Sequence, residues 1–475
     1  MVFFAGLLNI CSESVWADEP YTTFDLDTQL EVESEIVRLN SSELTVASNS
    51  SGNLRVTGDG GDSLSLSRLE ELALAYNPTI QQAAANLEKA KGIHTQVGLR
   101  PNPIFGYQAA EVGNEGRSGQ QGVFLGQEFV TAGKLGLNRD IAYQDIERSR
   151  WIYQTQEYRV LNDVRSSFYR LLGARAKVQL LDQLLSLAQA NLDAAQALAN
   201  AGQGTRPQAL QATVEVQNNR VALQNARNHQ EAMWRQLTAV VGVPTLSRER
   251  IEGDLTQTAP ILDWNSTWEW AQSNSPEVQS AARAVGRARF AIERARVEPI
   301  PNIEAQVGVQ YDASTHDTVT GLQIGIPIPV NNRNQGNIRA AQGELIRASR
   351  DIERVQLSLR HRLASSFKMY SNAQQQVTAY HDEVLPTAKE TLELVTEGYK
   401  SGELDYLQLV TTQRTYFQTG LTYVNAQTNL WLSVVAIEGL VLSGGLNEPG
   451  SSEGAIDAPD INSTYPLGLF PMMQP

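Results

Sequence analysis

The chain carries one pattern twice, with corresponding residues about 200 positions apart. The copies span residues 63–245 and 264–444, and residues 246–263 link them. The matches are spread over both copies and include Pro78 with Pro276, Asn102 with Asn302, Gly126 with Gly325, Asn138 with Asn337, Gly202 with Gly402, and Gln208 with Gln408. Because the spacing drifts by only about two residues, we interpret the chain as a duplication, which any fold must accommodate.

Each copy predicts the same order of elements. A short helix is followed by a second helix that begins at a proline, and a Pro-Asn break then opens a β-hairpin, at about 103–129 and 302–328. A long helix follows, at about 134–200 and 334–400, and a turn at Gly202 or Gly402 leads into a returning helix. A helix of ~67 residues would span ~100 Å. We therefore expect the long helices to pack side by side as a coiled coil or helical barrel, because globular-core helices average ~11–12 residues.

Pro386 distinguishes the two long helices. It lies inside the second one, and no proline occupies the matching place in the first. Proline cannot donate the helical hydrogen bond, so we expect a kink or division there and a different bend in the two copies.

The predicted strands of the second copy have one apolar and one polar face. Ile303, Val307 and Val309 alternate with Glu304 and Gln306. Such a strand fits the wall of a small soluble sheet, or a membrane β-barrel with lipid outside and water inside. Four strands are too few to close a barrel, and open edges are not tolerated in lipid. The barrel interpretation, which we favour, therefore needs other chains, and three copies would supply twelve strands.

The second hairpin meets the second long helix at a junction rich in residues that break regular structure. Pro327 and Pro329 should end the hydrogen-bonded strand ladder, since proline donates no backbone hydrogen bond. Gly336, Ala340 and Ala341 have small side chains or none, so they should let neighbouring helices approach closely. The junction residues that we single out are Pro327, Pro329, Arg333, Asn334, Gln335 and Gly336.

The two ends of the chain differ from its middle. Residues 1–17 have an apolar core and end in Val-Trp-Ala, which predicts a cleaved secretory signal peptide, although a basic segment before the core is missing. Residues 18–62 predict a flexible leader and 445–475 a disordered tail. Cys11, the single cysteine, lies inside the predicted signal, where the preceding residues fit a lipid attachment site poorly.

The composition and motifs exclude several function classes. The net charge of −14 and the lack of a basic stripe argue against nucleic-acid binding. No phosphate loop, zinc motif or nucleophile elbow occurs, so we predict no enzyme, no catalytic residue and no cofactor. Asp312, His316 and Asp317 could bind a metal loosely, but a polar surface loop explains them better, and we predict no metal site.

The duplicated unit resembles the TolC-type outer-membrane efflux proteins, from about Leu64 to Gly444. The residues that carry this resemblance include the run Pro-Ile-Pro-Val-Asn-Asn-Arg-Asn-Gln-Gly-Asn-Ile-Arg-Ala-Ala at 327–341. Together with Val384-Leu385-Pro386 and the segment 398–404, the Arg-Asn-Gln-Gly junction is most similar to the CzcC-like branch, the outer-membrane factors of cobalt-zinc-cadmium pumps.

The resemblance implies a fold that is mainly α with a small β part. A homotrimer would form a 12-stranded β-barrel in outer-membrane lipid, continuous with a periplasmic α-helical barrel. Each chain would be part of a passive duct that receives its cargo, heavy-metal cations, from a periplasmic adaptor protein and an inner-membrane proton-driven efflux pump. The periplasmic tip, where the adaptor docks, would comprise Gly202, Gln203, Gly402, Glu403, Leu404, Asp405 and Gln408.

The tip departs from the family pattern, which places aspartates shortly after the second glycine. The matching positions hold Gln408 and Thr411, while Glu403 and Asp405 lie nearer the turn. The two carboxylates could form a selective ring, the tip could close by packing of apolar residues, or the carboxylates could be solvated turn residues. Two other functions also stay open: a duct for organic compounds or secreted proteins, and a periplasmic coiled-coil scaffold that is no channel.

Overall fold

A computed structural model describes residues 64–113, 116, 118–202, 204–246 and 251–450. The predicted signal peptide, the predicted leader, Gln203 and residues 451–475 of the predicted tail lie outside these ranges.

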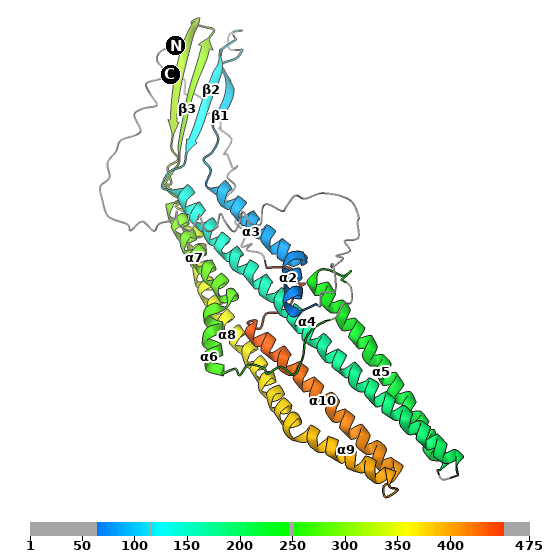
Figure 1. The fold of residues 1–475 in the computed structure, drawn as a ribbon. Helices are drawn as coiled ribbons and strands as arrows, with labels where there is room; N and C mark the ends of the chain where they lie inside the picture. Colours follow the sequence, from blue (N-terminus) through cyan, green and yellow to red (C-terminus); the bar gives the residue numbers. More distant parts are fainter. Residues whose placement is uncertain (1–63, 114–115, 117, 203, 247–250, 451–475) are drawn as a thin grey trace. The chain divides into compact units, whose positions relative to one another are not determined.

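The elements follow the same order in both copies (Figure 1). In the first copy they are α2 (Leu66–Tyr76), α3 (Pro78–Val97), β1 (Ile104–Ala110), β2 (Gln120–Phe129), α4 (Lys134–Asn200) and α5 (Arg206–Val241). In the second they are α6 (Trp264–Asn274), α7 (Pro276–Val297), β3 (Ile303–Asp312), β4 (Asp317–Gly325), α8 (Gln335–Ala379), a π-helical turn (Tyr380–Val384), α9 (Leu385–Lys400) and α10 (Tyr406–Glu438). The predicted fold class, mainly α with a small β part built from a duplicated unit, is confirmed.

The second helix of each copy starts in the same way. Asn77 caps α3 by accepting a hydrogen bond from the Thr79 backbone N–H at 2.9 Å, and Ser275 caps α7 through its hydroxyl. Each cap is followed by a proline, whose fixed φ suits the first helical position and whose missing N–H costs no hydrogen bond there. The helical conformation is therefore interrupted by one extended residue at matching points of the two copies.

The long helix is continuous in the first copy and interrupted in the second. α4 runs for 67 residues, whereas α8 ends after 45 and is followed by the five-residue π-helical turn. Pro386 lies in the first turn of α9, directly after that turn. A proline removes one helical hydrogen bond and crowds the preceding turn, and the wider π-helical turn accommodates it. The expected difference between the copies is thus located at residues 380–386.

The four strands form one antiparallel sheet in the order β1-β2-β3-β4. β1 with β2 and β3 with β4 are the two hairpins, and β2 pairs with β3 from Gln120 opposite Asp312 to Phe129 opposite Ile303. This pairing joins the two copies through backbone hydrogen bonds. β1 and β4 are the edges of the sheet and pair with no other strand of the described chain.

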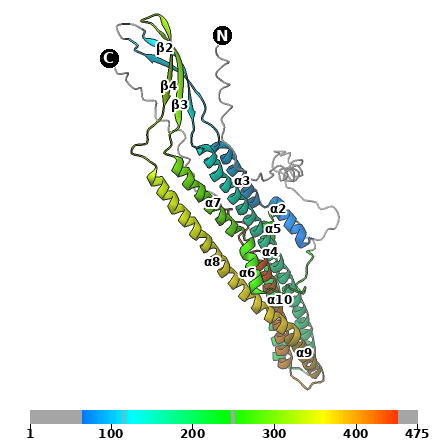
Figure 2. The same ribbon diagram turned by 90° about the vertical axis from the view of Figure 1, so that its left-hand side faces the viewer.

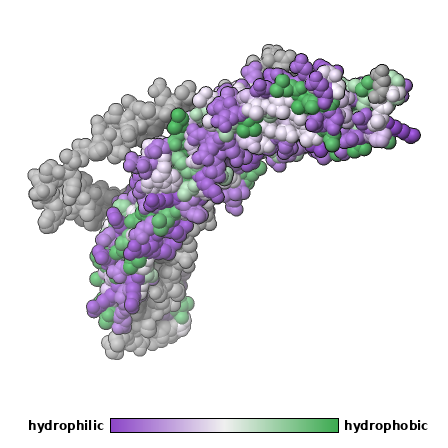
Figure 3. Space-filling view, turned by 90° about the horizontal axis from the view of Figure 1, so that it is seen from below, coloured by the Kyte–Doolittle hydropathy of each residue, from purple (hydrophilic) through white to green (hydrophobic). Residues whose placement is uncertain are grey.

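α4 organises the packing of the helices (Figures 1 and 2). It contacts α3, α5, α7 and α10, while α8 contacts α7 and α10. Apolar side chains fill three clusters, around Val160, Val164 and Leu237, around Leu359, Leu363 and Ile437, and around Leu192, Val216 and Val410. Hydrophilic residues cover much of the helical face in Figure 3, with separate apolar spots. No helix in the described ranges is both long and apolar enough to cross a membrane.

The chain beyond α10 is held against α4 by buried polar groups. The Asp163 Oδ2 accepts the backbone N–H groups of Gly444 and Gly445 at 3.1 and 2.7 Å. The Gly445 carbonyl accepts hydrogen bonds from the Thr79 Oγ1 at 2.7 Å and the Gln156 Nε2 at 3.1 Å. The predicted tail boundary at 445 is therefore too early, because these contacts depend on side chains far away in the sequence.

Asn162 provides a test of this attachment. Its side chain is 3% exposed, and its Nδ2 donates to the carbonyls of Gly439 and Leu442 at 2.7 and 2.9 Å. Asn162→Ala would remove both hydrogen bonds, although the Gly439 carbonyl keeps the Leu442 backbone N–H at 3.1 Å, and we expect the free energy of unfolding to fall by about 1–3 kcal/mol. Asn228→Ala, at an exposed site on α5, is the control and should change it by less than about 0.5 kcal/mol. Chemical denaturation followed by circular dichroism measures both, and equal values would contradict the assigned role.

Candidate functional site: a sheet, a junction and two helical turns

The sheet carries its large apolar side chains on one face, where they are exposed. Phe105 lies opposite Leu125, Leu125 opposite Val307, and Val307 opposite Leu322, so one apolar row crosses all four strands. Phe105 and Leu322 are 73% and 72% exposed. A lone soluble sheet would turn this face toward a core, and no described element covers it.

The other face is built from glutamines and glycines. Gln306 lies opposite Gln323, Gln108 lies on the same face of β1, and the Gln306 Nε2 reaches the Gln108 Oε1 at 3.5 Å. The ring of Phe124 lies over Gly106, where an added Cβ would come within 2.5 Å of it. The aromatic ring on this face is thus accommodated by a glycine, and Ile104 and Val319 on the edge strands add two aliphatic side chains to an otherwise mostly polar face.

The junction of the first copy is organised by Asn302 from the second copy. The Asn302 Oδ1 accepts hydrogen bonds from the Lys134 Nζ at 2.9 Å and the Thr131 N–H at 3.3 Å, and its Nδ2 donates to the Glu128 Oε1 at 2.7 Å. Burial lowers the pKa of Lys134, and nearby Glu298 opposes this shift. One asparagine thereby fixes the end of β2 and the start of α4 to the chain that enters β3.

The junction of the second copy uses Asn334 instead. This residue caps α8 with φ of 59°, in the left-handed region that asparagine tolerates, and its Nδ2 donates to the Ala295 carbonyl on α7 at 2.8 Å. The Arg333 N–H donates to the Gln335 Oε1 at 2.9 Å. β4 ends at Gly325, before Pro327 and Pro329. An added Cβ on Gly336 would meet nothing within 4 Å, so no close approach occurs at this glycine within the described chain.

Below the junction, charged residues connect α4 to α7. The Arg287 Nε lies 3.1 Å from the Asp145 Oδ2, and the Arg294 Nε lies 2.8 Å from the Asn138 Oδ1. Burial raises the pKa of Asp145, and Arg287 opposes this shift. These two arginines of α7 therefore connect the second copy to the first. The partners lie about 140–160 residues away in the chain, so sequence spacing alone did not identify them.

The turns that end the long helices contain Gly202 and Gly402, with φ of 72° and 80°. Both values lie in the left-handed region, where a side chain would be strained. After the first turn, Thr205 and Gln208 form a capping box at the start of α5. After the second, Asp405 caps α10, and its Oδ1 accepts the Gln408 N–H at 2.7 Å. Both caps satisfy helix N–H groups that would otherwise lack a partner.

The candidate tip residues of the second turn differ in exposure and in packing. Glu403 is exposed, while Leu404 packs on Gly398, where an added Cβ would lie 2.7 Å from the leucine Cδ1. Tyr406 is buried, and its ring lies 6.2 Å from that of Tyr399. Leu404 thus packs within its own hairpin, whereas Tyr406 also belongs to the apolar cluster with Leu192 of α4 and Val216 of α5. The carboxylate of Asp405 serves as the helix cap.

The loop of the second hairpin uses its aspartate locally. The Asp312 Oδ1 accepts the Ser314 N–H at 2.8 Å and the Ser314 hydroxyl at 2.5 Å. His316 donates its backbone N–H to the Asp312 carbonyl at 2.9 Å. Within the described ranges, no group of three or more His, Cys, Asp or Glu side chains is arranged to hold a metal ion.

The chain is similar in sequence to a family of known proteins. The model of a family described as Outer membrane efflux protein matches residues 69–243 and 269–441, one match in each copy and more than half of the chain together. The cobalt-zinc-cadmium resistance protein CzcC of Cupriavidus metallidurans is 23% identical over 379 residues, 79% of this chain and 89% of that protein.

Solved structures show the same fold. A CusC structure superposes with a TM-score of 0.69 at 16% identity and covers 82% of this chain and 96% of its own. The outer membrane protein VceC of Vibrio cholerae gives a TM-score of 0.66 at 15% identity, with 80% and 96% covered.

Asp405 allows its role as a cap to be separated from a role of its charge. Asp405→Ala removes the cap and should lower the free energy of unfolding by about 1 kcal/mol, whereas Asp405→Asn keeps a side chain that caps equally well and should leave it nearly unchanged. Glu403→Gln, next to the turn, is the control for loss of charge. Urea denaturation distinguishes the variants. Equal destabilisation by Asp405→Asn and Asp405→Ala would show that the charge matters rather than the cap.

Proposed function

Because the chain belongs to the outer membrane efflux protein family, we propose that it is the outer-membrane duct of a tripartite efflux system for heavy-metal cations. Members of this family are passive outer-membrane channels that extend into the periplasm, and they are not enzymes. The observation that carries the proposal is the four-stranded sheet, with an exposed apolar face, a polar face and two open edges, attached to helices of up to 67 residues.

Three copies would remove the edges of this sheet. An unpaired strand edge cannot stay in lipid, because its backbone N–H and C=O groups find no water there. β4 of one copy would pair with β1 of the next, and the closed barrel would turn its apolar row to lipid and its glutamines to water. Twelve strands leave room for a lumen, since small barrels of about eight strands are filled by side chains.

Exposed apolar side chains on the helices support the same assembly. Leu210, Val214 and Val221 lie on one face of α5 and are 57–60% exposed, and Ile346 and Leu357 on α8 are 65–66% exposed. α9 has no buried residue in the described chain. Neighbouring copies would cover these side chains and close the helices into a periplasmic tunnel. The turns at Gly202 and Gly402, with Gln203, Glu403, Leu404, Asp405 and Gln408, would form the tip that meets a periplasmic adaptor and, through it, a proton-driven pump of the inner membrane.

A pair of neighbouring residues on β4 tests the membrane assignment. Leu322 and Gln323 lie on opposite faces of the sheet. Leu322→Arg would place a cation in lipid at a cost of about 2–4 kcal/mol per chain near the bilayer centre, whereas Gln323→Arg would face the lumen. We expect Leu322→Arg to reduce the amount of protein in purified outer membranes and Gln323→Arg to leave it near the wild-type level. Equal recovery of both variants would contradict a lipid-facing row.

The cargo needs a separate test. Metal cations are proposed because CzcC, the relative named above, is a cobalt-zinc-cadmium resistance protein. Deletion of the gene should lower tolerance to cobalt, zinc and cadmium, and the wild-type gene should restore it, whereas Leu322→Arg should not. Unchanged metal tolerance together with new sensitivity to organic toxicants would reassign the duct to organic compounds. Unchanged tolerance to both, with protein absent from the outer membrane, would favour a periplasmic scaffold.

A further inference from the structure

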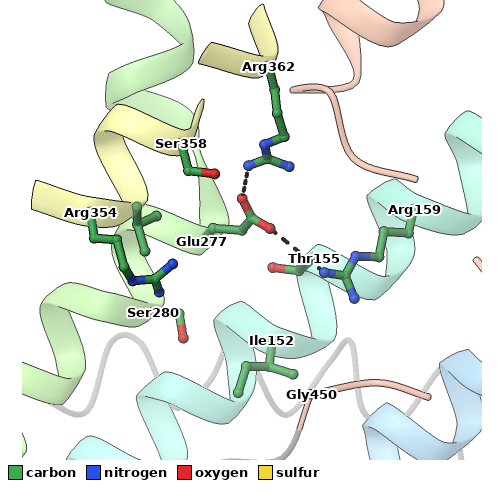
Figure 4. A pocket seen from close by; sticks show the side chains of 10 residues that line it. Ile152, Thr155, Arg159, Glu277, Ser280, Arg354, Ser358, Arg362 and Gly450 are labelled. Carbon is green, nitrogen blue, oxygen red and sulfur yellow. Dashed lines mark hydrogen bonds and ion pairs between the residues drawn. The ribbon is translucent and has the colours of Figure 1, made fainter. Parts of the chain in front are cut away.

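A cavity of about 370 Å³ lies between α4, α7 and α8, well away from the sheet and the turns (Figure 4). Its charged lining consists of Arg159 on α4, Glu277 on α7, and Arg354 and Arg362 on α8. Ser280 and Ser358 add hydroxyl groups. Three guanidinium groups thus surround one carboxylate, and the composition of the lining favours an anion over a cation.

The helical spacing shows that these side chains are brought together by the packing of three helices. Glu277 and Ser280 are three residues apart on α7, and Arg354, Ser358 and Arg362 follow one another at intervals of four on α8. Residues at these intervals share one face of a helix. In Figure 4, Arg159 and Arg354 lie on either side of Glu277, while Arg362 approaches the carboxylate from α8. The site is therefore held by rigid elements.

The arginines are only partly satisfied by the acidic groups around them. The Arg159 Nη2 is 3.7 Å from the Glu277 Oε1, longer than a hydrogen bond, while Arg362 contacts the same carboxylate directly. Arg354 pairs with Asp351 at 2.7 Å. The Nε atoms of Arg159 and Arg362 are buried and have no hydrogen-bond partner among the described residues. Neither serine hydroxyl has a hydrogen-bond partner there either.

We propose that this cavity binds a small oxyanion of phosphate or sulfate type. The guanidinium N–H groups of Arg159 and Arg354 and the hydroxyls of Ser280 and Ser358 would donate hydrogen bonds to its oxygens. Guanidinium groups are well suited to this task, because their fixed donors match the geometry of oxyanions. Glu277 binds Arg362 directly and Arg159 only at 3.7 Å, and Arg354 binds Asp351 through its Nε. The ligand would therefore take the remaining N–H groups of Arg159 and Arg354. Three guanidinium groups against one carboxylate in the lining favour an anion over a metal cation.

The position of the cavity indicates which source of phosphate can reach it. Ile152, which lines it, lies roughly 18 residues along α4 from the junction, a rise of about 27 Å. A lipid headgroup beside the sheet would not span this distance, so the ligand is a free anion from solution. The bound anion would hold α4, α7 and α8 together, whatever cargo the channel carries.

Thermal unfolding of the purified, detergent-solubilised protein tests the proposal. Sodium phosphate is titrated at constant ionic strength, so that general screening stays the same. The midpoint temperature of unfolding should rise with phosphate concentration and then level off, because a ligand that binds only the folded state stabilises that state. Arg159→Gln should raise the apparent dissociation constant for phosphate about tenfold or more. Ser280→Ala, which leaves every ion pair in place, should raise it about threefold and gives a readout even if Arg159→Gln misfolds.

Arg350→Gln is the matched control. Arg350 is an exposed arginine of α8 that pairs with Glu353 at 2.8 Å and does not line the cavity. Its variant should respond to phosphate like the wild type. A wild-type midpoint that changes no more with phosphate than with chloride would overturn the proposal, as expected if a carboxylate of a neighbouring copy filled the cavity. An equal response of the wild type, Arg159→Gln and Ser280→Ala would overturn it as well.

Discussion

Backbone pairing between β2 and β3 is the interaction on which the rest of the structure depends. Each copy of the duplicated unit contributes only a hairpin, and a two-stranded hairpin is marginally stable in water. Pairing over the ten residues of β2 turns two hairpins into one sheet with a continuous apolar row. It also fixes how α4 and α8 leave the sheet, since each follows a strand of that sheet after a short junction. Asn302 of the second copy strengthens this arrangement by binding the end of β2 and the start of α4 in the first copy.

The same sheet creates the need for partners. Its apolar residues face away from any described element, and its edge strands keep unpaired backbone groups. Both features are unfavourable for a single chain, and both are removed if copies join edge to edge within lipid. The exposed leucine and valine side chains of α5 would likewise be buried only if the helices of a neighbouring copy covered them. Membrane insertion and assembly would then be one process, because neither the apolar face nor the edges can be satisfied separately.

The sequence was sufficient for the features that depend on local periodicity. The duplication, the alternating strands and the proline and glycine breaks predicted the order of elements, and Pro386 marked the place where the second long helix is divided. Contacts between distant residues were less accessible. Nothing near Asn302 in the sequence indicates its bonds to Lys134 and Glu128, and Gly445 was assigned to the tail although Thr79 and Asp163 bind it. The arginine cavity was missed for the same reason, since three helices from both copies supply its lining.

The central claim is that three copies close the sheet and the helices into one duct. Native mass spectrometry of the protein, purified from outer membranes in mild detergent, tests it most directly. The account predicts a dominant species with three times the mass of the mature chain, which persists after dilution and separates into single chains only on unfolding. A stable species with the mass of one chain, folded and free of partners, would contradict it.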